Sequence, residues 1–171
     1  MTNFRRLFNQ RGFSLVELIV TIVIIGILAS VAVVNFGSND ITTKLAAAAK
    51  KARSDLQYAQ DMAISSANAV KVVLEQQNNQ YALQWEDGTP LPNIMGGGNF
   101  VVSFNSANFS GVSITDTDLP DGILVFKPPY GSPYYSDGVT ELESVERVLV
   151  LNDQKSVKIT PSTGRIFIDD E

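Results

Sequence analysis

The chain has 171 residues, with 13 basic and 18 acidic side chains, a formal net charge of −5, and neither histidine nor cysteine. This composition excludes Ser-His and Cys-His nucleophile pairs, disulfide bridges and the commonest zinc ligands. We therefore expect a single domain with one modest core, stabilised by packing, that is not an enzyme and uses no cofactor.

A basic leader opens the chain and runs into a long apolar segment. Arg5, Arg6 and Arg11 lie among the first twelve residues, which contain no acid, and the 22 residues that follow Glu17 carry no charge. At a rise of about 1.5 Å per residue, this stretch forms about 33 Å of helix, enough for a hydrocarbon core of about 30 Å. The basic leader predicts that the N-terminus is cytoplasmic and that the bulk of the chain lies outside.

A cleaved secretory signal is the alternative interpretation of this segment. Small residues at positions 30–32 offer a cleavage site. The apolar run, however, is longer than the usual stretch of about 7–15 residues, and it begins with an acid that a signal peptide does not need. An ionised glutamate in a lipid-bound helix is costly unless something compensates its charge, so Glu17 is predicted to be functional.

The segment Gly12-Phe13-Ser14-Leu15-Val16-Glu17-Leu18, continued by residues 24–29, resembles the class III leader and N-terminal helix of type IV pilins and type II secretion pseudopilins. The resemblance implies that prepilin peptidase cuts after Gly12 and that Phe13 becomes the N-methylated first residue. It also implies that Glu17 accepts the N-terminal amine of a neighbouring subunit during filament assembly, a pairing favoured in a medium of low dielectric constant.

One position departs from the pilin pattern. Val34 stands where such helices commonly carry proline, so the kink that proline would cause is not expected there. Residues 37–40, Gly-Ser-Asn-Asp, are predicted to supply the flexible point instead.

An amphipathic helix is predicted after this point, because small and apolar residues recur at steps of three and four. The stripe consists of Leu45, Ala49, Ala52, Leu56, Ala59 and Ala63. We expect it to pack on a sheet. The basic residues Lys44, Lys50, Lys51 and Arg53 cluster at its start, where anionic lipid or acids of a neighbouring subunit are the expected partners.

Short strands are predicted from residue 70 onward, separated by Gly, Pro, Asn and Asp. Their expected ranges are 71–74, 80–85, 100–104, 123–126, 147–151, 157–160 and 165–168. A long helix followed only by strands predicts an α+β fold with an antiparallel sheet. This order resembles the pilin ladle, and residues 56–64 and 163–166 resemble the GspH/FimT group of minor pseudopilins and minor pilins.

We accordingly expect four segments in the chain. Residues 1–12 form the cleaved leader, 13–36 a transmembrane and filament-core helix, 37–69 the amphipathic helix, and 70–171 the β-rich head.

Two stretches of the head carry weaker functional hypotheses. Asp116, Asp118 and Asp121 could supply oxygen ligands for calcium, but they lack EF-hand spacing, and we prefer a turn before the strand at residue 123. The loop 128–138 contains three prolines and three tyrosines, which suits either protein recognition or a cover over the sheet.

The favoured function is a minor pseudopilin of a type II secretion system, and the alternative is a minor pilin of a type IV pilus in assembly, adhesion or DNA uptake. The expected partners are other pilin or pseudopilin subunits, prepilin peptidase, an inner-membrane assembly platform and lipid. Nucleic acid is not expected, because acids outnumber bases. The expected location is the bacterial inner membrane, crossed once, with the head in the periplasm or on a filament. Cargo, host, and a tip or shaft position stay open.

Overall fold

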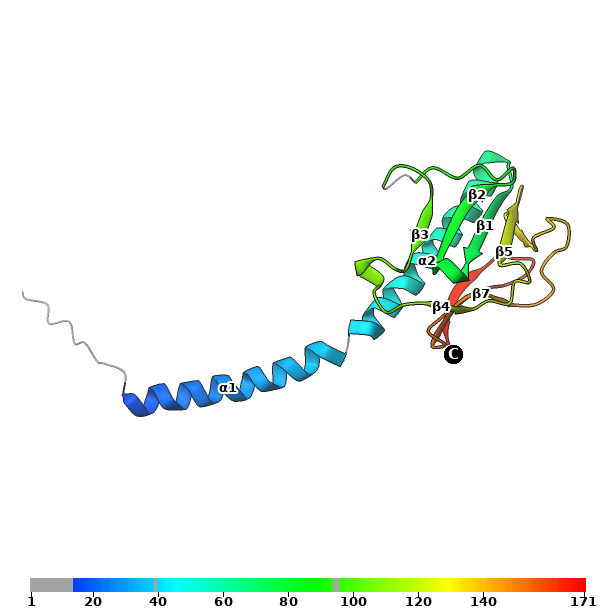
Figure 1. Cartoon of the computed structure of the whole chain (residues 1–171). Coiled ribbons are helices and arrows are strands. Elements are labelled where there is room, and N and C mark those ends of the chain that lie inside the picture. The colour runs from blue at the N-terminus through cyan, green and yellow to red at the C-terminus, as the bar shows by residue number, and fades with distance from the viewer. Residues whose placement is uncertain (1–13, 39, 94–95) are drawn as a thin grey trace, which may run out of the picture. The chain divides into compact units, whose positions relative to one another are not determined.

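The structure, a computed structural model, describes residues 14–38, 40–93 and 96–171. It divides into two compact units, Met1–Asp40 and Ile41–Glu171. Helix α1 (Leu15–Ser38) is the described element of the first unit, and helix α2 (Asp40–Ser66) opens the second (Figure 1).

Helix α1 is apolar on every side. Between Leu15 and Leu28, eleven large apolar side chains expose half or more of their surface. Isolated exposed hydrophobic residues are ordinary on protein surfaces, but a contiguous apolar surface of this extent marks a contact with lipid or with another chain.

Helix α2 buries one face. All six residues of the predicted stripe are at most 1% exposed, whereas Arg53 and Asp61 on other faces are exposed. The alanines of the stripe bring the helix close to the strands that cover it. The prediction of a helix that faces the core is confirmed.

Five antiparallel strands form the first sheet, in the order β3-β2-β1-β5-β6. Strand β1 (Val70–Glu75) pairs with β2 (Gln80–Trp85) through a short 3₁₀ turn that ends at Asn79 with a φ of 52°. The remaining strands are β3 (Val101–Ser103), β5 (Ile123–Lys127) and β6 (Ser132–Tyr134).

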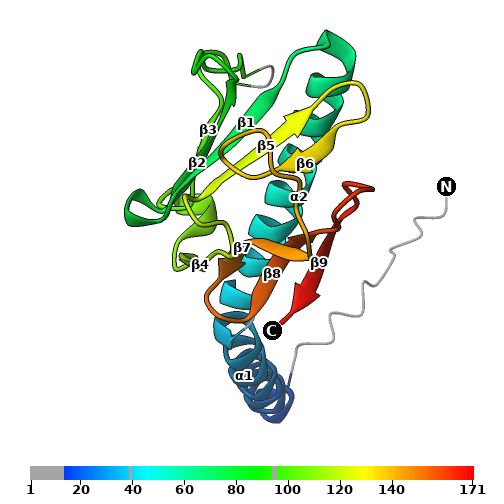
Figure 2. The same ribbon diagram turned by 90° about the vertical axis from the view of Figure 1, so that its right-hand side faces the viewer.

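Four further antiparallel strands form the second sheet, in the order β4-β7-β8-β9. They are β4 (Ile114–Asp116), β7 (Glu146–Leu151), β8 (Lys155–Ile159) and β9 (Ile166–Asp170). Figure 2 shows that α2 runs along both sheets. Buried residues of the helix and of both sheets belong to one hydrophobic core.

The α+β class and the long N-terminal helix with an antiparallel β head are as predicted. Two details differ from the sequence-based expectation. The head contains two sheets instead of one, and strands β4 and β6 fall where no strand was expected. Each of these strands has three residues, and each is held by pairing with residues that lie elsewhere in the sequence.

Candidate functional site

The predicted processing residues Gly12 and Phe13 lie outside the described residues. Glu17 is the third residue of α1, in the first helical turn, where the helix dipole favours a negative charge. The turn closes on Ser14, whose carbonyl oxygen accepts the Leu18 N–H at 3.1 Å. The Glu17 side chain is exposed and has no ion-pair partner within residues 14–38, 40–93 and 96–171.

Apolar neighbours surround this acid along the helix. Val16 is 67% exposed and Leu18 is 53% exposed, so Glu17 is a single charge on an uncovered apolar surface. The predicted span, residues 13–36, begins outside the described residues. Among the residues that the structure describes, no helix combines the length and apolar character needed to cross a membrane.

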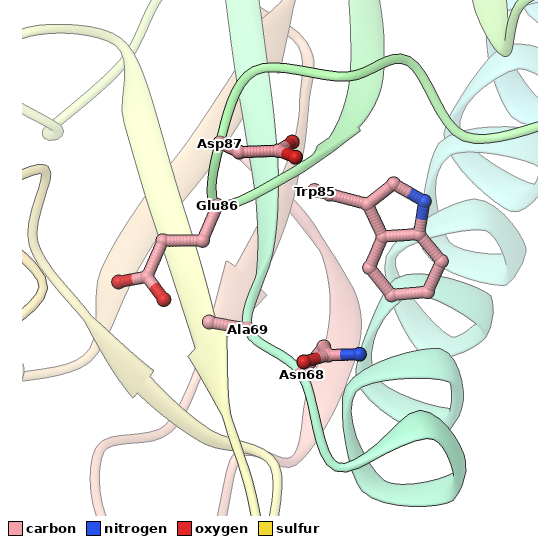
Figure 3. A pocket seen from close by; sticks show the side chains of 5 residues that line it. All are labelled: Asn68, Ala69, Trp85, Glu86 and Asp87. Carbon is pink, nitrogen blue, oxygen red and sulfur yellow. The ribbon is translucent and has the colours of Figure 1, made fainter.

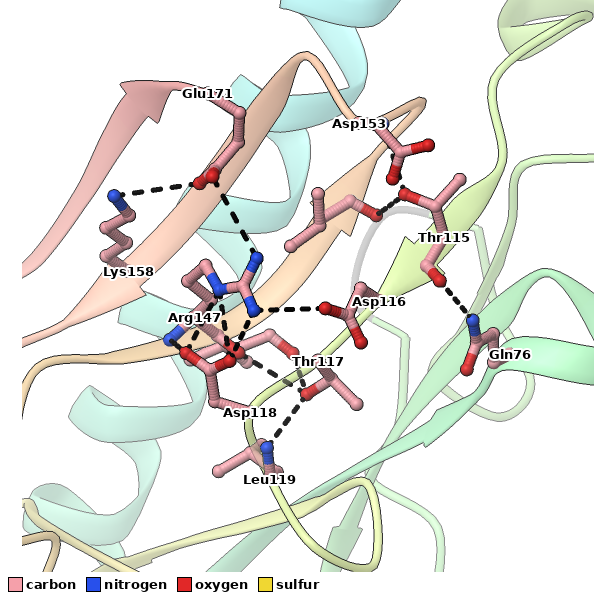
Figure 4. A network of polar contacts seen from close by, with 12 residues as sticks. Gln76, Thr115, Asp116, Thr117, Asp118, Leu119, Arg147, Asp153, Lys158 and Glu171 are labelled. Atoms are coloured by element: carbon pink, nitrogen blue, oxygen red, sulfur yellow. Dashed lines mark hydrogen bonds and ion pairs between the residues drawn. The ribbon is translucent and has the colours of Figure 1, made fainter.

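Two of the three calcium candidates contact one guanidinium group (Figure 4). Arg147 Nη2 lies 2.7 Å from Asp118 Oδ1 and 3.0 Å from Asp116 Oδ2. Arg147 Nε and the Arg147 backbone N–H also donate to Asp118. These hydrogen bonds to Arg147 hold the pKa of Asp118 below its usual range, and the contact with Asp118 raises the pKa of Arg147. The arginine thus supplies the positive charge that a cation would bring.

The third candidate, Asp121, instead accepts a hydrogen bond from the Ser136 hydroxyl at 2.6 Å. Gly122 N–H donates to Leu119 O at 3.0 Å, which closes the turn expected before β5. Within the described part of the chain, no group of three or more His, Cys, Asp or Glu side chains is placed to hold a metal ion.

The tyrosine-rich loop divides into anchored and exposed rings. Tyr134 donates to Glu141 at 2.9 Å, and Tyr135 donates to Glu146 at 3.0 Å. Tyr130 is 81% exposed. Two of the three tyrosines therefore fix the loop to the head, and one is available to a partner.

A buried acid that sequence reasoning missed lies on α2. Asp55 is 5% exposed; it accepts hydrogen bonds from Tyr81 Oη at 2.6 Å and from Lys51 Nζ at 2.5 Å. Burial, together with the negative charge of Asp55, raises the pKa of Tyr81 well above its usual value. In the sequence, Asp55 lies three residues after Ala52 and four before Ala59, at the edge of the predicted stripe, whereas Asp61 lies on the opposite side of the helix. This spacing was the signal that could have identified Asp55.

A hollow of about 530 Å³ lies at the end of β2 and is lined by Asn68, Ala69, Trp85, Glu86 and Asp87. In Figure 3 the Glu86 carboxylate points away from the Trp85 indole. The lining of this hollow contains exposed acids but no nucleophile and base pair.

Residues 7–33 match the family described as the prokaryotic N-terminal methylation motif. No curated protein matches the chain. Among solved structures, the chain is similar to the type IV minor pilin FimU of Pseudomonas aeruginosa, with 17% identity and a TM-score of 0.46 over 72% of this chain and 90% of that chain.

The matched motif includes residues 15–33 of α1, and the chain continues as an amphipathic helix on an antiparallel β head. Residues 7–33 therefore carry the prokaryotic N-terminal methylation motif, and the described part of the chain has the α+β order expected from the sequence.

Proposed function

We propose that this protein is a structural subunit of an extracytoplasmic pilus-like filament, processed after Gly12 and assembled through α1. One observation carries the proposal: most of α1 lies within the methylation motif, and the helix exposes eleven large apolar side chains between Leu15 and Leu28. The chain itself leaves this surface uncovered in the described residues. Lipid before assembly, and the helices of other subunits afterwards, would bury it.

The role of Glu17 follows from the cost of isolated charge in an apolar environment. Packing α1 among other helices would remove Glu17 from water, which strongly penalises a lone carboxylate. Cleavage after Gly12 would create an amine on Phe13 close to this position in the sequence. In the proposed filament, the amine of one subunit pairs with Glu17 of its neighbour, and each charge compensates the other.

A minor pseudopilin of a type II secretion system is the preferred role, and a minor pilin of a type IV pilus is the second candidate because the N-terminal motif suits both machines. Deleting the gene in its host would separate them. Loss of exported protein with normal pili is expected for the pseudopilin, whereas loss of pili with normal export would establish the minor pilin.

Catalysis and DNA binding are not part of the proposed function. Removing residues 1–12 removes Arg5, Arg6 and Arg11, which leaves 10 bases against 18 acids (13 − 3 = 10). Lys51, a member of the basic cluster on α2, is already paired with Asp55. The head is expected to repel the phosphates of duplex DNA, so a mobility shift even at low salt would contradict this part of the proposal.

Processing gives a direct test. Mass spectrometry of the membrane-extracted protein is expected to find N-methyl-Phe13 as the first residue. Gly12→Leu should leave the precursor uncut, because a bulky side chain replaces the small residue before the cleavage site. Gly26→Leu is the matched control: an added Cβ at Gly26 meets nothing within 4 Å, and cleavage should proceed. A mature start at or after Val33 would instead establish a secretory signal.

A further inference from the structure

Two outer strands of the head have their open sides covered by other parts of the chain. Beside β6, residues 140–142 run alongside the strand, with an isolated bridge between Tyr134 and Glu141 and a hydrogen bond from Leu142 N–H to Pro133 O. Beside β4, the Asn79 side chain accepts the Ile114 N–H at 2.8 Å. Further strands cannot pair easily on either side.

A third outer strand, β9, is protected by charge. Asp169 and Asp170 lie on it with exposed side chains, and they form ion pairs with Lys158 and Lys155. Charged side chains along an outer strand discourage the addition of another strand.

Strand β3 has neither form of protection in the described residues. It consists of Val101, Val102 and Ser103, with no charge and no proline, and Val101 is 44% exposed. Its only neighbour in the first sheet is β2. Short length alone limits its tendency to pair.

The backbone of β3 presents hydrogen-bonding groups on its open side. Phe100 O accepts the Leu83 N–H, and Phe104 N–H donates to Asn79 O, so these two residues face β2. Alternate residues of an antiparallel strand direct their backbone groups to the same side. Val101 and Ser103 therefore direct theirs away from β2. Val101 N–H donates to Asn99 O, and among the described residues the Val101 C=O and the Ser103 N–H have no hydrogen-bond partner, so they can pair with an added strand.

An apolar groove of about 580 Å³ lies between β3 and α2. Tyr58 of α2 and Phe100 line it with their rings stacked 5.6 Å apart, and Val102 lines it from the strand. Grooves of this size and character accommodate side chains of a bound ligand or peptide.

The charges in the described lining of the groove are already paired. Lys51 Nζ lies 2.5 Å and 2.7 Å from the two oxygens of Asp55. A charged occupant would lose its hydration and find no free counter-charge there. The groove therefore favours an uncharged occupant.

We propose that β3 and this groove form a docking site for an extended, uncharged segment of another polypeptide. The segment adds a strand to the first sheet, as in known cases of strand addition, and places an apolar side chain beside Tyr58 and Val102. This interaction uses only residues of the second unit, Ile41–Glu171, so it holds whether or not the chain is processed after Gly12.

The test uses the full-length chain in lipid nanodiscs and a synthetic peptide, acetylated and amidated Thr-Val-Ile-Val-Thr. Fluorescence anisotropy with an uncharged label should give a dissociation constant below about 1 mM. Hydrogen exchange at residues 100–104 should slow when the peptide is present. Peptides with proline or glutamate in place of isoleucine should bind at least about tenfold more weakly, because they lose a ladder hydrogen bond or bury a charge.

Variants of two equally exposed valines locate the site. Val101→Lys should weaken peptide binding at least about tenfold, since a lysine on an outer strand opposes strand addition. Val145, 47% exposed, is the matched position, and Val145→Lys should bind the peptide normally. Absence of binding, or equal binding by both variants, would overturn the proposal. Crosslinking that shows pairing of two copies of this chain through β3, abolished by Val101→Lys, would assign the site to a second copy instead.

Discussion

Helices α1 and α2 each carry an acid beside apolar side chains, and the two acids have different surroundings. Asp55 of α2 is 5% exposed and is bound by Lys51 and Tyr81. Glu17 of α1 is exposed and has no ion-pair partner in the described ranges. A carboxylate in an apolar environment requires a compensating charge or hydrogen bonds. The head supplies these for Asp55, and we propose that a neighbouring subunit supplies them for Glu17.

The apolar surfaces of the two helices show the same contrast. The stripe of α2 is covered by the two sheets of its own head, whereas α1 exposes eleven large apolar side chains between Leu15 and Leu28. We expect the buried face of α2 to contribute to folding, and we propose that the exposed apolar surface of α1 serves association. Four experiments test this contrast between contacts made within the head and the exposed surface of α1. They follow in order of decreasing expected effect.

The largest effect is expected at Glu17. Glu17→Leu should insert into membranes at least as well as the parent chain, because a charge is gone, yet its incorporation into filaments should fall at least about tenfold. Crosslinking in the host measures incorporation. The unfolding midpoint of the head should not change.

Glu143→Leu provides the control, since Glu143 is an exposed acid of the head and should be dispensable for assembly. Normal incorporation of Glu17→Leu would remove the proposed role of α1 in pairing, and with it the contrast between the two helices.

Asp55→Ala should lower the free energy of unfolding by about 3 kcal/mol. The substitution leaves the buried Tyr81 hydroxyl without its acceptor and Lys51 without its counter-charge. Because Lys51 is partly exposed, the loss of stability should lie at the lower end of the range observed when one partner of a buried ion pair is removed. Chemical denaturation followed by circular dichroism measures the change.

The matched control is Asp61→Ala on the same helix. Asp61 is exposed, so its replacement should change stability by less than about 0.5 kcal/mol. Equal losses for the two variants would show that helix propensity, and not the buried network, determines the stability at Asp55.

Gly164→Ala should lower the free energy of unfolding by a smaller amount, about 2 kcal/mol. Gly164 has a φ of 61°, and an added Cβ would displace the Gln60 amide, which donates to Gly131 O at 3.0 Å. Gln60 thus joins α2 to turns of both sheets. The left-handed backbone and the lost hydrogen bond each contribute about 1 kcal/mol.

Gly88→Ala separates the two contributions. Gly88 has a φ of 87°, but an added Cβ there meets nothing within 4 Å. Thermal unfolding should therefore show about half the loss seen for Gly164→Ala, and equal losses would mean that the Gln60 contact contributes nothing to the covering of α2.

The smallest effect concerns acid stability. Arg147 lowers the pKa of Asp118 in the folded head, so the unfolded chain binds the proton more readily. The stabilisation that this ion pair gives the folded head is fully present above the pKa of Asp118 in the unfolded chain, about 3.9. It is lost as the pH falls through the lower pKa that Asp118 has in the folded head. Asp118→Asn should cost about 1 kcal/mol at pH 7, with solvent screening included, because the side chain is 29% exposed.

Denaturation midpoints measured from pH 7 to pH 3 would test the sign. The stability of Asp118→Asn should fall less steeply in acid than that of the parent. The ion pair with Lys158 also lowers the pKa of Asp169. Part of the dependence of stability on pH should therefore remain in both proteins. A steeper fall in the variant would contradict the assigned direction.

Sequence reasoning succeeded where a pattern repeats within one element. The spacing of Leu45, Leu56 and the alanines between and beyond them predicted the buried face of α2, and β2 has the predicted bounds of 80–85. It failed for β4 and β6, because three residues are too few to show alternation and Pro133 counts against a strand. Neither could alternation reveal two sheets, since it does not identify a strand's partner.

The candidate sites divide in the same way. Glu17 was identified as a functional candidate from sequence because a single charge in a long apolar run is visible in one dimension. Asp55 and Arg147 were missed because their partners, Tyr81 and Asp118, lie 26 and 29 residues away. The acids considered for calcium share a short segment, but Asp118 turns to Arg147 and Asp121 to Ser136.

By itself, the sequence determined what depends on neighbours along the chain: the basic leader, the apolar helix with its acid, the helical stripe and the order of most strands. Only the tertiary structure decided which charges are neutralised inside the head and which outer strand is left open beside a groove. Helix and strand formation follow local periodicity, whereas ion pairing and sheet order depend on contacts between residues far apart in sequence.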